Sequence, residues 1–405
     1  MDNVEYYRPS LDDADSLFLL EQICFPSPWD LQEIKALIQR DPVLYTIGAF
    51  VDGSAVGYIS ATISEPGTLH VISLCVHPEQ RRRGIAGDLL GSALYWGRHM
   101  EAERTVLEVR TENSPAIEFY GNSGFTVQKT LPDFYGEGEN GIFMEKPLVP
   151  LVHTLNTSLY LNNRLNRIPR LGVILGSGIG WATEPFGIGQ SIPFSEIPSM
   201  AGEAVEGHSH TLQTSKDGRI IFVMGRRHHY QGYSGREITL LPAALAALGV
   251  GTWVLTSSSG AVDPDYSVGD AMIFTDHINF SGCIPDPPEH STGHSVYSLQ
   301  LQEIAGKCMK NCRRGVFASV SGPAYETAAE VALIRESGAS AVSMSTVQEA
   351  LALRSMGCRV LALALITNAV DSGESVCHDE VLSAQNTVRE KQEDSFIQLL
   401  KRLSK

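Results

Sequence analysis

Apolar and polar positions along the first part of the chain alternate between helical and strand spacing. Apolar residues at helical spacing predict helices over residues 11–24, 29–40, 84–99 and 115–122. Short apolar runs predict strands over residues 45–51, 55–64, 70–76, 105–110 and 141–145. Asp52-Gly53 between the first two strands predicts a β-hairpin. Pro147 and Pro150 then mark a short linker.

A second series of elements follows the linker and has longer apolar runs. The predicted strands cover residues 171–175, 220–224, 252–256, 271–274, 315–320, 341–344 and 360–367. The predicted helices include residues 155–166, 240–248 and 328–336. Strands joined by helical crossovers imply a largely parallel, buried sheet, with functional sites at the strand ends.

One uncharged stretch within this series, residues 238–262, is long enough to suggest a membrane span. Pro242, Gly249 and Gly251 interrupt it, so a buried helix followed by a buried strand fits better.

The chain length of 405 residues is greater than a domain with a single hydrophobic core usually has, and we therefore expect two domains. Hydrophobic content of 43% with 19% charged residues fits a soluble globular protein.

Charge and cysteine content narrow the choice of partners and compartment. Residues 1–148 hold 22 acidic and 11 basic residues, and the rest hold 24 and 20, so most of the net charge of −15 is N-terminal. Such a protein repels a phosphate backbone, which disfavours nucleic acid as a partner. The seven scattered cysteines and the absence of a signal-peptide pattern favour the cytoplasm. Cys308 and Cys312 fit ordinary packing better than a metal site.

A first chemical motif follows the predicted strand 70–76, where Arg81-Arg82-Arg83-Gly84-Ile85-Ala86 opens a helix. Small residues at positions 84 and 86 let backbone N–H groups converge on an anion at the helix N-terminus. A solvated basic turn would explain this motif alone. Two further motifs follow it along the chain, Leu107-Glu108-Val109-Arg110-x-x-Asn113 and Ala116-x-x-Phe119-Tyr120-x-x-x-Gly124-Phe125.

Over residues 4–147 this order and spacing resembles the GNAT family of N-acetyltransferases, and within it the bacterial ribosomal-protein alanine N-acetyltransferases. The resemblance implies acetyl-CoA as co-substrate, and Glu108 as base with Tyr120 as acid. Glu108 could instead be a surface carboxylate paired with Arg110, and Tyr120 a core aromatic. The acetyl-CoA site implied by the resemblance consists of Leu74, Val76, Arg81, Arg82, Gly84, Ala86, Asn113 and Tyr120.

A second set of motifs lies in the later series, at the predicted strand ends. Its members are Gly176-Ser177-Gly178-Ile179-Gly180, Gly207-His208, the run from Gly225-Arg226 to Gly232-Tyr233, Gly322-Pro323-Ala324-Tyr325-Glu326-Thr327, Met344-Ser345-Thr346, Thr367-Asn368 and His378. Cleaving an N-glycosidic bond with phosphate requires an anion site below the sugar and a site for the departing purine. Small-residue loops, an arginine, histidines and a base-binding carboxylate suit that chemistry.

Together these motifs resemble the trimeric purine nucleoside phosphorylases over about 250 residues. The implied phosphate site consists of Ser177, Arg226, His228, Ser345 and the backbone at Ser258. The implied nucleoside site consists of Tyr230, Tyr325, Glu326, Met344, Asn368 and His378. The implied catalytic residues of this part are Asn368, Glu326, His208 and His228.

The resemblance also implies a base preference. A carboxylate at Glu326 is satisfied by N1–H of hypoxanthine or guanine and unpaired against adenine, and Asn368 can donate to N7 or O6. We therefore expect inosine and guanosine to be preferred over adenosine. Glu326 could instead cap a helix, and Ser177 could be a turn residue. His208, His210, His228 and His229 could form a metal site, but no cysteine or paired carboxylate accompanies them.

Several positions depart from the phosphorylase pattern. Thr256-Ser257-Ser258-Ser259-Gly260-Ala261 stands where the family usually has Thr-Asn-Ala-Ala-Gly-Gly. Ser343 and His210 replace usual glycines, and Gln231 stands where glutamate is common. The stretch 282–297 lacks the usual Arg-Phe-Pro loop. These changes leave room for a protein that only binds purine or phosphate.

We therefore expect an α/β protein of two domains joined by a linker at 149–155. Residues 1–148 would form a GNAT domain of α+β type with a mixed, mostly antiparallel sheet. Residues 156–405 would form a phosphorylase-type α/β domain with a central mixed sheet flanked by helices. The co-substrates would be acetyl-CoA with an amine acceptor, and inorganic phosphate with a purine nucleoside. We expect no metal, no membrane, and a homotrimer. Two alternatives stay open, an acetyl-CoA sensor and a purine-binding scaffold.

Overall fold

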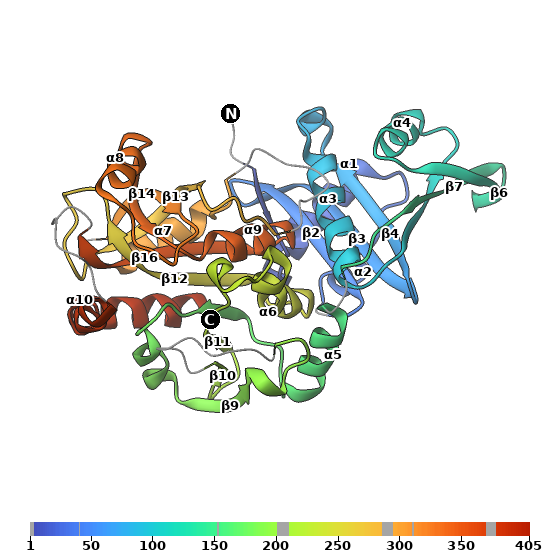
Figure 1. The fold of residues 1–405 in the computed structure, drawn as a ribbon. Coiled ribbons are helices and arrows are strands. Elements are labelled where there is room, and N and C mark those ends of the chain that lie inside the picture. Colours follow the sequence, from blue (N-terminus) through green and yellow to red (C-terminus); the bar gives the residue numbers. More distant parts are fainter. Residues whose placement is uncertain are drawn as a thin grey trace. The chain divides into compact units, whose positions relative to one another are not determined.

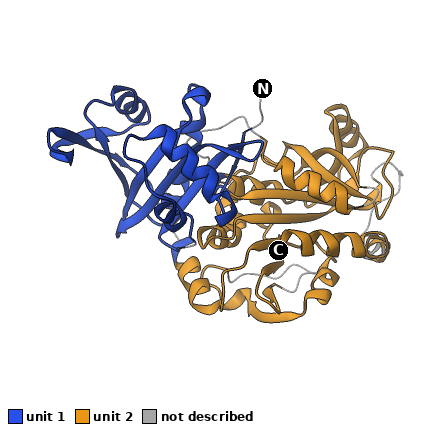
Figure 2. Cartoon of the chain, turned by 180° about the vertical axis from the view of Figure 1, so that it is seen from behind, with its two compact units in different colours: residues 1–155, 287–292, 355–357 blue, residues 156–286, 293–354, 358–405 orange. Residues whose placement is uncertain are grey.

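The computed structural model describes residues 4–39, 41–151, 154–200, 210–285, 295–309, 312–369 and 378–405, with the side chains of the last helix described from residue 384. The chain forms two compact units (Figure 2). Unit 1 contains Met1–Leu155 and also Ser355–Gly357. Unit 2 begins at Asn156 and runs to Lys405 apart from short segments assigned to unit 1.

Unit 1 is a mixed, mostly antiparallel sheet with helices on both faces (Figure 1). Its strands are β1 (Glu5–Tyr7), β2 (Leu44–Val51), β3 (Ser54–Glu65), β4 (Thr68–Val76), β5 (Arg104–Arg110), β6 (Thr126–Gly136) and β7 (Glu139–Pro147). Its helices are α1 (Ala14–Cys24), α2 (Leu31–Leu37), α3 (Ile85–His99) and α4 (Ser114–Asn122). The strand order in the described residues is β1-β2-β3-β4-β5-β7-β6, in which only β4 and β5 pair in parallel. The predicted fold class of this part is confirmed.

The helices cover opposite faces of this sheet because neighbouring strand residues point to opposite sides. Ile85 and Leu89 of α3 lie against Gly57 of β3. The next residue, Tyr58, packs instead in a cluster with Leu17 of α1 and residues of α2.

Three elements of unit 1 differ from the sequence prediction, and the first is the short strand β1, which was not predicted. The second helix is shorter than expected at both ends: it starts after Asp30, whose side chain accepts hydrogen bonds from the Gln32 and Glu33 N–H groups, and it ends at Leu37. Strand β6 was not predicted. Most of its residues are exposed and it contains Pro132, so it lacks the apolar alternation that signals a strand.

Unit 2 is a sheet with helices packed on it. Its strands are β8 (Leu171–Ile174), β9 (Ile188–Pro193), β10 (Thr211–Ser215), β11 (Ile220–Met224), β12 (Thr252–Ala261), β13 (Ala271–Asn279), β14 (Arg313–Ser319), β15 (Ala339–Ser343) and β16 (Arg359–Ala369). The helices are α5 (Thr154–Arg164, across the boundary), α6 (Gly235–Ala247), α7 (Leu299–Cys308), α8 (Ala328–Glu336), α9 (Val347–Ser355) and α10 (His378–Leu403).

The strand order among the described residues is β15-β14-β13-β16-β12-β8-β11-β10-β9, with an additional pairing of β15 to β12. The centre, β16-β12-β8-β11, is parallel, whereas β10 and β9 at one edge are antiparallel. The predicted central mixed sheet is confirmed. Strands β9 and β10 were not predicted.

The uncharged stretch 238–262 supplies the buried helix and strand that the sequence predicts. Helix α6 is buried along almost its whole length, and β12 is buried except at Ser258. No helix among the described residues is both long and apolar enough to cross a membrane. On one face of the sheet, Phe396 and Leu400 of α10 pack with Leu301 of α7 and the strand residues beneath them.

Candidate active sites

The parallel centre of unit 2 brings its predicted site residues to one edge. Strands β8, β11, β12 and β16 run in the same direction, so their carboxyl ends lie together. The predicted residues at or just after these ends are Ser177, Arg226, Ser258 and Asn368. Strand β15 joins the same edge, because Val342 pairs with Gly260 of β12.

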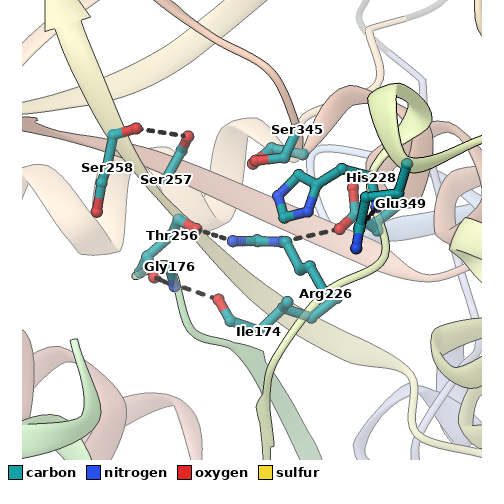
Figure 3. A network of polar contacts seen from close by, with 11 residues as sticks. Ile174, Gly176, Arg226, His228, Thr256, Ser257, Ser258, Ser345 and Glu349 are labelled. Carbon is teal, nitrogen blue, oxygen red and sulfur yellow. Dashed lines mark hydrogen bonds and ion pairs between the residues drawn. The ribbon is translucent and has the colours of Figure 1, made fainter. Parts of the chain in front are cut away.

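Arg226 is the buried centre of this edge (Figure 3). Its Nε donates to Glu349 Oε1 at 2.8 Å, and its Nη1 donates to the Thr256 carbonyl at 2.8 Å. Both side chains of the ion pair are only 3% exposed. The remaining nitrogen, Nη2, is buried and has no hydrogen-bond partner among the described residues. A buried cationic donor without an acceptor is costly, so the site favours an anionic ligand oxygen there.

His228 lies beside this guanidinium and is held in its neutral form. Burial, followed by the positive charge of Arg226, lowers the pKa of His228 to about 4. Its ring stacks on Tyr230 with centroids 4.9 Å apart. Its backbone N–H donates to Gln231 Oε1 at 2.9 Å. A neutral imidazole can donate one hydrogen bond to an anion without carrying charge itself.

The glycine loop after β8 is tied to β12 by two hydroxyl groups. Thr256 Oγ1 accepts from the Gly176 N–H at 2.9 Å, and Ser258 Oγ donates to the Ser177 carbonyl at 2.8 Å. Ser345 follows β15 and lies on the same side of Arg226 as His228 (Figure 3). The structure thus gathers hydroxyl, guanidinium and imidazole groups around one small region.

The predicted base-binding residues lie on β16 and in the loop between β14 and α8. Asn368 on β16 is level with Gly260 of β12, and its Oδ1 accepts from Thr367 Oγ1 at 3.2 Å. Its amide NH₂ is therefore the side that can donate to a ligand. Burial raises the pKa of Glu326. The backbone of Gly322 packs so closely on Met344 that an added Cβ would lie 2.3 Å from its sulfur.

Aromatic side chains complete this region. Burial raises the pKa of Tyr230, and Tyr325 adds to the shift through its proximity. Tyr325 is 43% exposed, which leaves its ring accessible to a ligand.

Two predicted site histidines are not described by the structure. His208 lies outside the described residues. His378 is the first residue of α10, and its side chain also lies outside the described part.

In unit 1, the predicted acetyl-CoA residues lie where β4 and β5 separate. The two strands pair in parallel only from Thr68 to His70 of β4 in the described chain. Beyond that point Leu74 and Val76 pair with β3 on one side only. A strand edge of this kind can pair with an extended ligand.

The basic loop next to this edge ends in a left-handed residue. Arg81 Nε donates to the Val76 carbonyl at 3.1 Å and fixes the loop to the strand end. Gly84, with φ of 84°, is the N-cap of α3, so Ala86 lies in the first turn. Arg82 also has a positive φ, of 63°. Glycine at position 84 allows the backbone to turn its N–H groups toward an anion.

The predicted acid and base lie on β5 and α4. Glu108 Oε2 is 2.7 Å from His70 Nε2, an ion pair if the imidazole is protonated. Tyr120 is buried, which raises its pKa above the ordinary value. Asn113 caps α4 by accepting from the Ala116 N–H at 3.3 Å. Arg110 pairs with Glu139, not with Glu108 as one alternative held.

Sequence reasoning assigned no role to three residues that the structure places at these sites. Glu349 and His70 make the contacts described above, and Thr256 belongs to the run 256–261 that departs from the usual phosphorylase pattern. A lone carboxylate inside the mostly apolar stretch 347–353 was a signal for a buried partner. His70 lies 38 residues from Glu108, and nothing in the local pattern links them.

No group of three or more histidine, cysteine or carboxylate side chains that could hold a metal occurs among the described residues. The neighbouring pair Cys308 and Cys312 consists of free thiols. Cys308 packs in the core cluster of unit 2.

Comparison with known proteins matches each of the two parts of the chain to a protein family. Residues 170–401 match the phosphorylase superfamily, and residues 14–125 match the acetyltransferase (GNAT) family. Purine nucleoside phosphorylase 1 of Bacillus subtilis (strain 168) is 35% identical over 258 residues, covering 60% of this chain and 94% of the relative. Purine nucleoside phosphorylase of Bos taurus is 34% identical over 268 residues, covering 60% and 92%.

A solved structure is similar as well. The crystal structure of schistosoma purine nucleoside phosphorylase in complex with hypoxanthine aligns with a TM-score of 0.55 at 25% sequence identity. The alignment covers 62% of this chain and 97% of that chain.

Proposed function

Since the chain belongs to the phosphorylase superfamily and carries an acetyltransferase (GNAT) domain before that part, we propose that residues 156–405 cleave purine nucleosides with inorganic phosphate. The products are the free base and ribose 1-phosphate. The observation that carries this proposal is Arg226, whose Nη2 is a buried cationic donor without an acceptor among the described residues. It lies at the sheet edge where small-residue and hydroxyl-bearing loops meet.

In the proposed reaction, a phosphate oxygen attacks C1′ of the ribose while the bond from C1′ to N9 breaks. The bonding electron pair leaves with the purine, which then takes a proton. Arg226, Ser177, Ser345 and the Ser258 backbone hold the dianion, and neutral His228 donates a hydrogen bond. Holding the nucleophile beneath the sugar removes most of the entropic cost of bringing the two reactants together.

Glu326 and Asn368 would bind the leaving base. The carboxylate accepts from N1–H of a 6-oxopurine, and the amide NH₂ donates to N7 or O6, where negative charge develops. Adenine has no hydrogen at N1, so the carboxylate would face a lone pair. Tyr325 would contact the base, and Tyr230, Met344 and His378 would surround the ribose. We propose that His208 lies near phosphate and ribose.

The test is hypoxanthine release from inosine with and without phosphate. Phosphate-dependent release with formation of ribose 1-phosphate supports the proposal. Release that ignores phosphate indicates a hydrolase, and binding without release indicates a scaffold.

A matched pair of variants sharpens the experiment. Arg226→Lys keeps the charge but loses the forked donor, and should raise KM for phosphate. Arg227→Met should leave it unchanged, because Arg227 donates to the Ser199 and Glu237 carbonyls and stacks on Tyr233.

We propose that residues 1–148 transfer an acetyl group from acetyl-CoA to a protein N-terminal or small-molecule amine. Glu108, paired with His70, removes a proton from the amine, and Tyr120 protonates the thiolate that leaves. The loop from Arg81 to Ala86 binds the pyrophosphate. Transfer of labelled acetyl groups to a panel of amines tests this proposal. Binding of acetyl-CoA without transfer to any amine would favour a sensor.

We further propose a homotrimer in the cytoplasm, which multi-angle light scattering of the full chain and cell fractionation would test.

A further inference from the structure

Thr256 joins two parts of the chain that carry phosphate ligands in the proposed reaction. It lies in the middle of β12, between β8 and β16, and is fully buried. Its hydroxyl accepts from the Gly176 N–H at 2.9 Å and donates to the Ile174 carbonyl at 3.2 Å. One side chain therefore holds both the end of β8 and the first residue of the loop that contains Ser177 (Figure 3).

The backbone of the same residue holds the arginine. The Thr256 carbonyl accepts from Arg226 Nη1 at 2.8 Å, while Glu349 accepts from Nε. Two of the three guanidinium nitrogens are thereby fixed, and the direction of the third follows from the rigid planar fork. The position of Nη2 relative to the Ser177 loop is thus set through Thr256.

The loop has little freedom to find another arrangement. A Cβ added at Gly176 would lie 3.1 Å from the Ser258 backbone nitrogen, so the loop backbone packs directly on β12. Without the threonine hydroxyl, the Gly176 N–H would lose its acceptor in a buried setting. A buried unsatisfied N–H is costly, and the loop would shift toward another acceptor. A shift of about 1 Å in a binding group can reduce activity by about two orders of magnitude.

We propose that Thr256 is a positioning residue for the phosphate subsite, because its hydroxyl and carbonyl together set the separation between the Ser177 loop and Arg226. This inference rests on the proposed phosphorolysis. It assigns Thr256 no contact with substrate. Removing its hydroxyl should therefore change phosphate binding alone, through the displaced Ser177 loop and Arg226.

Thr256→Val removes the hydroxyl at nearly constant volume, and Thr256→Ser retains it. Thr214→Val is the matched control, because Thr214 is also a buried strand residue, on β10, and its Oγ1 accepts from the Gln190 N–H at 2.8 Å. Steady-state kinetics would give KM for phosphate, KM for inosine and kcat. Calorimetry with inorganic phosphate would give its Kd independently of turnover.

For Thr256→Val we expect KM and Kd for phosphate to rise about tenfold, with KM for inosine unchanged. Thr256→Ser should stay within about twofold of the wild type, and Thr214→Val should match it. If Thr256→Val does not fold, Thr256→Ala removes the same hydroxyl and carries the same expectation.

Wild-type phosphate affinity in a folded variant without the hydroxyl would overturn the inference alone, provided that the wild type cleaves inosine. An equal loss in Thr256→Ser would also overturn it, because methyl packing would then be the cause. A wild type that neither binds phosphate nor cleaves inosine would remove the proposed function and this inference together.

Discussion

Replacing Glu349 by alanine should destabilise unit 2 more than any loss of a surface ion pair. Arg226 and Glu349 are each 3% exposed, so removing the carboxylate leaves a guanidinium buried without its counter-ion. Breaking one partner of a buried pair typically costs about 3–5 kcal/mol. That loss corresponds to a roughly 10²–10⁴-fold rise in the population of the open state.

Hydrogen exchange of peptides from β12 and β16 measures this opening in unit 2 itself, which matters because unit 1 need not unfold at the same time. Glu393→Ala is the control, because Glu393 pairs with Arg389 where the side chains are 31% and 39% exposed. We expect it to cost about 1 kcal/mol or less. The double variant Arg226→Met with Glu349→Leu should regain most of the lost stability. An effect of Glu349→Ala no larger than that of the control would refute the reasoning.

Three further predictions concern the two sites. The pKa of His228 is lowered to about 4 in the folded chain, so the unfolded chain binds that proton first as the pH falls, and the free energy of unfolding should decrease from about pH 6.5 toward pH 4. In urea denaturation at a series of pH values, His228→Asn should make this decrease smaller. An unchanged decrease would count against a buried neutral imidazole. Glu326→Gln should lower kcat/KM for inosine by about 10²–10³-fold with little change in KM for phosphate, and equal cleavage of adenosine by the wild type would contradict the assigned base contact. Glu108→Gln and Tyr120→Phe should each reduce acetyl transfer by about 10²–10⁴-fold while inosine cleavage persists, whereas unaffected transfer would favour a sensor.

The predictions from sequence were most accurate where local pattern decides the structure. The buried strands of unit 2 are continuous apolar runs, and a parallel sheet covered on both faces produces such runs. The antiparallel strands β9 and β10 and the exposed strand β6 have no such run, because their stability comes from pairing with a neighbour. The start of the second helix was predicted too early because the Asp30 cap is a single side-chain contact, which periodicity does not reveal.

The amino-acid sequence was enough to predict which kinds of chemistry the chain carries. The motifs resemble two families, and that resemblance implies an anion site at Arg226 and His228 and an acid–base pair at Glu108 and Tyr120. Their order along the chain was enough to indicate two families, and matches of residues 14–125 and 170–401 agree with both.

The groups that hold the predicted site residues in place became clear from the folded chain and not from the sequence. Glu349 lies 123 positions after Arg226, and Thr256 lies 80 positions after Gly176. Such contacts arise because packing the sheet buries polar groups, and each buried group must then take whichever partner the neighbouring strand or helix brings within reach. Local sequence cannot specify that partner, because strand order and register are fixed only when the whole sheet assembles.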